Sequence, residues 1–343
     1  MTTRQATHAG SWYTGDGPTL SRELDEWLAA VPAQTTPIGA SSAAAGPVSL
    51  PASGARAIIA PHAGYSYSGP AAAWAYKAID WSVAGGTRLT GSERVFLLGP
   101  SHHYYLTGAA LSRCAEYETP MGNLRLDAET IAELKGTGVF ETMSVAKDDA
   151  EHSLEMHLPY IFKMLSQHHS SPADFPPLTP ILIGSTSPVT ERRLGGLLAQ
   201  YLANPRNVFV VSSDFCHWGS RFQYTYYQPG EAKTGYALSS KHDPRQRGDP
   251  AIHESIAKVD AESMDAIETG SHAEFLDQLA RTGNTVCGRH PIGVIMAAIE
   301  AGGLQGEGNV GKFKFVRYER SSLVHHIRDS SVSYCSAFAV LPA

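Results

Sequence analysis

Histidines follow two apolar segments of this sequence at the point where each segment reaches a proline. His62 comes after Ala-Pro at the end of ARAIIAP, and His102 and His103 come after Pro-Ser at the end of RVFLLGPS. Neighbouring side chains on an extended loop point in opposite directions, so at most one of His102 and His103 is expected to face His62. The other is expected to support the site or to pack outward. Imidazoles at the ends of apolar strands are typical of a pocket in an α/β protein, where histidine binds metals or transfers protons.

A third segment, VFVVSSDFCHWG from residue 208, repeats this plan and presents Asp214, Cys216 and His217. A further run, EHSLEMH from residue 151, places His152 and Glu155 on one face of a helix. Its spacing differs from that of an H-E-x-x-H zinc motif. We therefore interpret Asp214, His217 and His152 as supporting or substrate-facing groups, and Cys216 as a residue that either joins them or packs as a small hydrophobe.

Cys287 begins the polar string CGRHPIG, which leads directly into an apolar helix. A helix N-terminus and the neighbouring Arg289 and His290 would favour a thiolate, which is a nucleophile or a metal ligand. Two histidines and one anionic ligand are the arrangement that non-haem Fe(II) uses, whereas a thiolate shifts the preference towards Cu(I) and Zn(II). A buried, inert cysteine and a hydrolase with Cys287 as nucleophile, His290 as base and Asp214 as orienting group remain open alternatives.

Strands alternate with helices along the chain, which predicts an α/β sandwich around a mostly parallel or mixed sheet flanked by helices. A single domain over residues 1–343 is expected, with flexible insertions at 33–54 and 228–250 and a shorter one near 84–92. Pro159 predicts a late start or a kink in the helix that contains it. The expected helices cover 18–31, 70–79, 127–136, 152–166, 191–203, 251–268, 272–281 and the residues after 287, and the expected strands cover 56–60, 94–99, 178–183, 208–212, 313–319 and 331–341.

The composition is that of an ordinary globular protein, with 43% hydrophobic and 17% charged residues. A net charge of −6 argues against nucleic acid as a partner. The sequence shows neither an apolar leader segment nor a long apolar run, so no membrane insertion is expected. Four widely spaced cysteines without a CxxC pattern suit a reducing compartment, and a cytoplasmic location, extending to the nucleus, is expected.

Seven strings in order, THAGSWYTG, IIAPHAGYSYSG, LGPSHH, EHSLEMHLPY, VVSSDFCHWG, CGRHPIG and DSSVSY, resemble the Memo family, named as mediators of receptor-tyrosine-kinase-driven cell motility. The resemblance runs from about residue 4 to residue 340. It implies a fold similar to the LigB-like class III extradiol dioxygenases, with a metal pocket at one end of the sheet. The ligands implied by the resemblance are His62, His102 and Cys287, with Asp214, His217 and His152 as catalytic groups in the same pocket.

The resemblance implies a redox protein that binds iron (Fe²⁺) or copper, with zinc the less favoured metal, and that is linked to cell motility and redox signalling. The dioxygenases place a carboxylate where this chain has Cys287, so catechol cleavage is not carried over, and a copper-dependent, superoxide-generating oxidase is the enzyme class that remains. The second function implied is a signalling scaffold that binds phosphotyrosine peptides in the same pocket. The residues expected around that pocket are Trp12, Tyr67, His103, Cys216 and His290.

Overall fold

The computed structural model describes residues 2–82, 94–239 and 249–342. Its centre is a nine-stranded sheet in the order β12-β16-β4-β11-β5-β10-β6-β9, with β15 paired to β16. The strands are β4 (Ala55–Ala60), β5 (Val95–Pro100), β6 (Ala109–Leu111), β9 (Phe140–Thr142), β10 (Leu178–Ile183), β11 (Val208–Ser212), β12 (Asp214–Trp218), β15 (Phe313–Arg320) and β16 (Ser331–Val340). The mixed α/β architecture predicted from the sequence is confirmed.

The four middle strands β4, β11, β5 and β10 run parallel, and β16, β12 and β15 extend the sheet in antiparallel fashion. Every residue of β4, β5, β10 and β11 is buried, as expected for parallel strands covered on both faces. Phe96 of β5 stacks on Phe209 of β11, with ring centroids 4.6 Å apart. The parallel strands therefore form a rigid core whose carboxyl ends lie along one edge.

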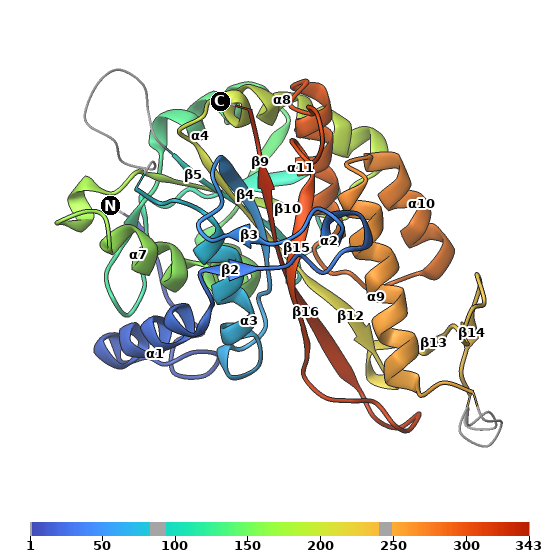
Figure 1. Cartoon of the computed structure of the whole chain (residues 1–343). Coiled ribbons are helices and arrows are strands. Elements are labelled where there is room, and N and C mark those ends of the chain that lie inside the picture. Colours follow the sequence, from blue (N-terminus) through green and yellow to red (C-terminus); the bar gives the residue numbers. More distant parts are fainter. Residues whose placement is uncertain (1, 83–93, 240–248, 343) are drawn as a thin grey trace.

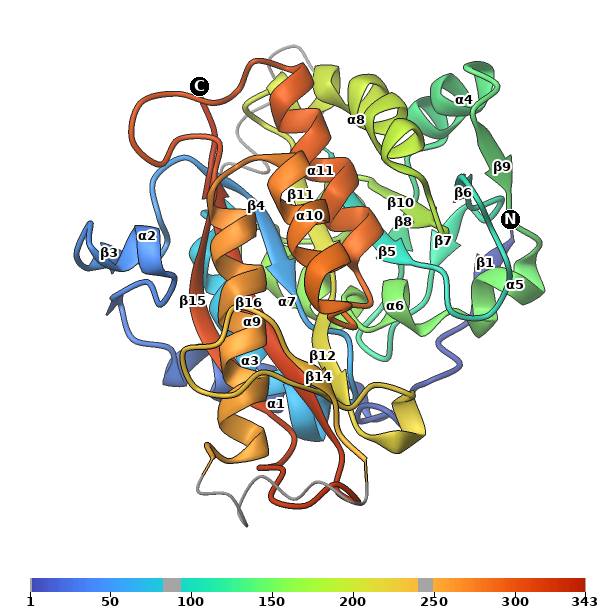
Figure 2. The same cartoon turned by 90° about the vertical axis from the view of Figure 1, so that its right-hand side faces the viewer.

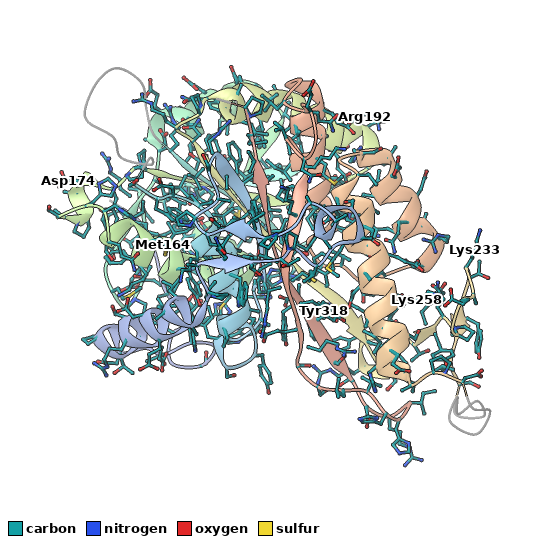
Figure 3. The ribbon with its side chains drawn as sticks, in the orientation of Figure 1. Met164, Asp174, Arg192, Lys233, Lys258 and Tyr318 are labelled. Carbon is teal, nitrogen blue, oxygen red and sulfur yellow. The ribbon has the colours of Figure 1, made fainter. Side chains whose placement is uncertain are left out.

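Helices cover both faces of this sheet (Figure 1). One face carries α1 (Gly17–Ala30), α3 (Tyr65–Ala78) and α7 (Leu158–Ser166), and the other carries α8 (Pro188–Ala203), α9 (Ile252–Glu268), α10 (His272–Thr282) and α11 (Arg289–Ala301). Figure 2 looks onto the second face, where α10 and α11 lie in front of the strands. Side chains fill the space between helices and sheet (Figure 3).

Shorter elements complete the chain. They are α2 (Ala40–Ala43), α4 (Ala128–Gly136), α5 (Val145–Ala150), α6 (His152–Glu155) and the strands β1 (Thr3–Arg4), β2 (Gln34–Thr35), β3 (Val48–Ser49), β7 (Glu116–Tyr117), β8 (Leu124–Arg125), β13 (Tyr226–Tyr227) and β14 (Tyr236–Ala237). None of the helices in the described residues combines the length and the apolar character that crossing a bilayer requires.

Two helices differ from those expected at positions that carry a proline. The helix predicted over 152–166 is divided into α6 and α7, because Pro159 lies in the first turn of α7, where its missing N–H costs nothing. The helix predicted from residue 70 begins earlier, at Tyr65, so Pro70 lies inside α3. Tyr160 of α7 donates a hydrogen bond to the carbonyl of Gly69 in this early turn, at 2.7 Å.

Residues 33–54, which the composition predicts to be a flexible insertion, are packed against the domain. They carry β2, α2 and β3. The hydroxyls of Ser41 and Ser42 both donate to the Glu268 carboxylate on α9, each at 2.7 Å. The predicted insertion near 84–92 lies outside the described residues, as do residues 240–248 of the insertion predicted at 228–250.

Candidate metal centre

Five polar side chains predicted from separate parts of the sequence line one cavity at the carboxyl ends of the parallel strands. The cavity has a volume of about 730 Å³, and His62, His102, His152, Asp214 and His217 lie on its wall. His62 follows β4, His102 follows β5, and Asp214 begins β12, one residue after the end of β11. Because parallel strands end along the same edge of a sheet, residues far apart in the sequence meet here.

Hydrogen bonds fix the protonation of the His62 ring. Its Nδ1 lies 2.6 Å from the Ser212 hydroxyl, which donates its own proton to the carbonyl of Ser153 at 2.8 Å. Nδ1 must therefore be the donor, which leaves a lone pair on Nε2. Burial, and then the neighbouring His102 and His152, lower the pKa of His62 well below its usual range, so the ring is neutral.

Glu151 fixes His102 in the same way. Its carboxylate accepts from His102 Nδ1 and Ser153 N, each at 2.9 Å, and from His102 N at 2.7 Å. Burial alone would raise the pKa of Glu151, but the hydrogen bonds and charge of His102 outweigh it and lower that pKa to about 2. His102 consequently donates through Nδ1, and in its neutral form it has a lone pair on Nε2, which is the carboxylate–histidine arrangement that supports metal ligands.

Cys287 contacts two residues of the cavity wall but does not line the cavity itself. Its Sγ lies 3.2 Å from His62 Nε2 and accepts a hydrogen bond from Asp214 N at 3.2 Å. Burial, and then the Asp214 carboxylate, raise the pKa of the Cys287 thiol well above its usual range. This corrects the sequence-based expectation of a stabilised thiolate.

The reason for that correction is that the side chains of Arg289 and His290, which follow Cys287, point to other partners. Arg289 is exposed and donates from Nε to His290 Nε2 at 3.1 Å. His290 Nδ1 lies 2.7 Å from the Glu191 carboxylate on α8. Both ring nitrogens of His290 are thus bonded to partners other than Cys287. His290 is therefore not available as the base that the hydrolase hypothesis requires. His290 is also absent from the cavity wall, contrary to the expectation that it belongs to the pocket.

The ligand atoms fall into three groups within the described residues, each with its atoms within 4.8 Å of one another. They are His62–His102–His152, His62–Asp214–Cys287 and His103–Glu151–His152. The predicted ligands His62, His102 and Cys287 do not form one such group. His62 instead belongs to the first two groups and joins the imidazole side of the pocket to the thiol side.

The remaining predicted residues divide between the cavity and its surroundings. His152 stacks on His102 with centroids 4.4 Å apart, and burial together with His102 lowers its pKa to about 3. His103 is exposed, with Nε2 3.3 Å from His152 Nδ1.

Trp12 and Tyr67 line the cavity. Cys216 does not, because it packs among Trp218, Tyr227 and other buried residues in a separate cluster.

Two residues at this site, Ser212 and Arg221, were not singled out by the sequence, and Glu151 was interpreted only as a supporting or substrate-facing group of the EHSLEMH run. Ser212 and Glu151 set the ring protonation of His62 and His102. Arg221 lines the cavity and lies over the Phe222 ring, 4.4 Å from its centroid. The string SSD carries Ser212 beside the predicted site residue Asp214, which is the one signal that could have revealed it.

Comparison with known proteins adds an independent observation. A family profile described as Memo-like protein matches residues 4–338. Protein MEMO1 of Homo sapiens is 42% identical over 333 residues, covering 97% of this chain and 96% of that protein. Protein MEMO1 of Xenopus tropicalis is 41% identical over 338 residues, covering 98% and 97%. The memo-1 homolog of Caenorhabditis elegans is 38% identical over 334 residues, covering 97% and 81%.

Among solved structures, an uncharacterized protein from Escherichia coli K12 aligns with 82% of this chain and 99% of its own length, at a TM-score of 0.42 and 13% identity. This similarity is too low to support an inference about function.

Proposed function

This chain belongs to the Memo family, and from that premise we propose that it is a metal-binding redox protein that holds one iron or copper ion at His62, His102 and Cys287. The observation that carries the proposal is the pair of imidazoles whose Nδ1 atoms are both committed to hydrogen bonds, to Ser212 and to Glu151. Each ring keeps a lone pair on Nε2 at the same pocket.

The spacing of His62 Nε2 and Cys287 Sγ fits an ion, and a bond to His102 in addition requires the side chains to close around it, because the three proposed ligands do not form one compact group without an ion. Metal bonds of about 2.1 Å to nitrogen and 2.3 Å to sulfur, at a tetrahedral angle, separate the two ligand atoms by about 3.6 Å. His62 Nε2 and Cys287 Sγ are 3.2 Å apart, so a movement of a few tenths of an ångström would accommodate the ion. Cys287 must lose its thiol proton to become a ligand, which couples binding to proton release.

The chain's own groups would handle protons around the ion, which supplies one-electron redox chemistry when bound. Asp214 accepts from the backbone N–H of His62 at 2.9 Å and of Ala63 at 3.3 Å, which fixes its position. Burial raises the pKa of Asp214, so its carboxyl group can hold a proton beside the pocket. His217 Nδ1 lies 2.8 Å from the Phe215 carbonyl, so it donates there and leaves Nε2 as the ring nitrogen available for proton transfer. Asp214, His217 and His152 are therefore the proposed catalytic groups.

The choice between metals follows from the two sides of the pocket. Imidazole and carboxylate ligands suit iron, and a thiolate suits Cu(I) and zinc. Zinc has no redox chemistry and is the less favoured occupant of a redox site. Links to redox signalling and cell motility, in the cytoplasm or the nucleus, belong to the same proposal and follow from the family resemblance.

The test is the metal content of purified protein after loading with iron(II) or copper and removal of excess metal. Wild type is expected to retain about one ion per chain, and His62→Ala and Cys287→Ala to retain far less. His168→Ala, at an exposed histidine outside the cavity, is the matched control. Full retention of metal by both site variants would overturn the proposal. Anomalous scattering from metal-loaded crystals would locate the ion directly.

A second function, binding of phosphotyrosine peptides, is favoured by one observation. Arg221 brings a guanidinium group to a cavity wall that also carries the aromatic side chains of Trp12 and Tyr67 and several serine hydroxyls. Guanidinium groups bind phosphate oxygens, and aromatic rings pack on a tyrosine ring. A single arginine predicts weak binding that persists after metal removal and is lost in Arg221→Gln but retained in the exposed-site control Arg22→Gln. Finding no binding by metal-free wild type across a panel of phosphotyrosine peptides would exclude this function.

A further inference from the structure

A series of aromatic rings lies in the core beneath α3 and begins close to the cavity. Its first member is Tyr13, the residue after Trp12, which lines the cavity with its ring 4.5 Å from that of His152. From Tyr13 the successive ring centroids are separated by 5.5, 5.7, 4.6 and 6.0 Å, through Tyr65, Tyr160, Tyr76 and Trp81. Tyr160 and Tyr76 are stacked with an interplanar angle of 8°. From Tyr13 to Trp81 the rings are thus close enough for an electron to move between neighbours in short steps.

This series also has a branch towards the surface. Trp27 on α1 is partly buried, and its ring lies 5.8 Å from that of Tyr65. Tyr65, Tyr76, Tyr160 and Trp81 are all buried. An electron removed from the buried rings can therefore be replaced from the direction of the cavity or from the surface of α1.

The hydroxyl groups along the series differ in what accepts their protons. Tyr65 and Tyr160 donate to backbone carbonyls, which do not take up a proton. Tyr13 donates to Glu155, whose carboxylate is already paired with Arg4 at 2.6 Å. Tyr76 donates to the ring of His157, with 2.8 Å between its oxygen and Nδ1. Tyr76 is therefore the tyrosine of this series whose proton can pass to an uncommitted base.

The His157 ring is placed to take that proton. The Tyr76 oxygen is 2.8 Å from Nδ1 and 3.5 Å from the His157 carbonyl, so the shorter contact favours a phenol proton that points to Nδ1 and a ring hydrogen on Nε2. Burial lowers the pKa of His157 to about 3, so the ring is neutral and takes a proton only from a strong acid such as an oxidised phenol. Nε2 is buried and has no hydrogen-bond partner among the described residues. A buried polar atom left without a partner needs an explanation, and a redox role is one of the recognised ones.

We propose that Tyr76 and His157 form a redox-active pair that donates one electron and transfers one proton within the protein. A one-electron oxidant of the kind that iron or copper produces with peroxide removes an electron through the aromatic series and is reduced by one electron. The Tyr76 O–H bond breaks and its proton forms a bond to His157 Nδ1, which gives a neutral phenoxyl radical and an imidazolium. A one-electron reductant then reverses both transfers. The pair would protect the protein by reducing oxidants formed at the metal pocket, and this role rests on the proposed function.

Its chemistry can be tested without the metal, so that failure of metal binding and failure of this pair are distinguishable. Metal-free protein is oxidised by photogenerated ruthenium(III) tris-bipyridine, frozen, and examined by electron paramagnetic resonance. All samples carry Phe in place of the exposed tyrosines Tyr67, Tyr105 and Tyr236, which would otherwise contribute radicals. The expected result is a phenoxyl signal that is present in this background and retained in Tyr201→Phe, a tyrosine of α8 that donates to Glu133.

Two variants decide the assignment. Tyr76→Phe is expected to lose the signal because the phenol is gone, and His157→Gln to lose it because an amide accepts a hydrogen bond but takes no proton. A signal of unchanged intensity in either folded variant overturns the proposal. A further measurement needs only the background protein, so it tests the proposal even if a variant fails to fold. After exchange into D2O, double-resonance spectroscopy should detect one deuteron hydrogen-bonded to the phenoxyl oxygen, and its absence would equally overturn the assignment.

Discussion

The substitution Glu151→Gln separates the role of a carboxylate from that of a neutral group of the same shape. Glu151 accepts three hydrogen bonds, from His102 N, His102 Nδ1 and Ser153 N. A glutamine must place its NH2 group at one of the two oxygen positions, and each position faces a backbone N–H. One backbone hydrogen bond is lost in either orientation, which would cost roughly 1–3 kcal/mol of stability.

The larger effect is expected on the metal. With the NH2 group facing His102 Nδ1, the ring is driven to the tautomer with its proton on Nε2, and the lone pair that would bind the ion is lost. Loss of a supporting carboxylate typically weakens metal affinity by about 10–100-fold, or roughly 1.4–2.8 kcal/mol. Competition with a chromophoric chelator measures this affinity for iron(II) or copper in wild type and variant.

The matched control is Glu129→Gln, because the Glu129 side chain is 77% exposed on α4 and is not part of the cavity wall. It should bind metal with wild-type affinity. If folded Glu151→Gln also bound metal with wild-type affinity, the assignment of His102 as a ligand oriented by Glu151 would be wrong.

Three further outcomes are expected. Ser212→Ala removes the acceptor that holds the proton of His62 on Nδ1, and chelator competition should show metal affinity falling by about 10–100-fold. Gly288→Ala places a methyl group 2.3 Å from the carbonyl oxygen of Ser212, so α11 must shift and metal content should fall, whereas Gly196→Ala has open space around the new methyl and should bind normally. Hydrogen bonds from two histidines lower the pKa of Glu191 against the opposing effect of burial, so its contribution to stability is present at neutral pH and lost as the pH falls below about 4. Denaturation of wild type and Glu191→Gln across this range should show their stabilities converging in acid.

The periodic and capped elements of the fold could be predicted from the sequence. The helix expected at 127–136 is α4, and Asp127 caps it by accepting a hydrogen bond from Thr130 N at 3.0 Å. The strand expected at 208–212 is β11. The sequence did not indicate β12, directly after β11, because this strand is defined by antiparallel pairing with β16, more than a hundred residues later. Pairing of distant segments leaves no local pattern to recognise.

At the site too, the position of a residue could be predicted from the local sequence, whereas its chemical state depends on residues far away in the sequence. Residues at strand ends could be placed together because the strand order of an α/β fold brings those ends to one edge. The state of each side chain depends on partners from other elements. Cys287 was expected to be activated by Arg289 and His290, its neighbours in sequence, yet the structure sets its pKa through burial and Asp214, which lies in β12. Sequence proximity at the start of a helix does not fix the direction in which successive side chains point.

The position of His62 constrains what this pocket can hold. Its Nε2 atom has one lone pair, because Nδ1 carries the proton donated to Ser212. That single lone pair is shared between the group with His102 and His152 and the group with Asp214 and Cys287. Two ions cannot both use it, so a site built on His62 holds one ion, and the metal decides whether its bond to His102 or its bond to Cys287 is the stronger. Nitrogen and oxygen ligands suit iron, and a thiolate suits Cu(I). His62 can therefore bind iron mainly with the neighbouring imidazoles, or copper mainly with the Cys287 thiolate. This explains physically how one cavity could accommodate both of the metals that the family resemblance implies.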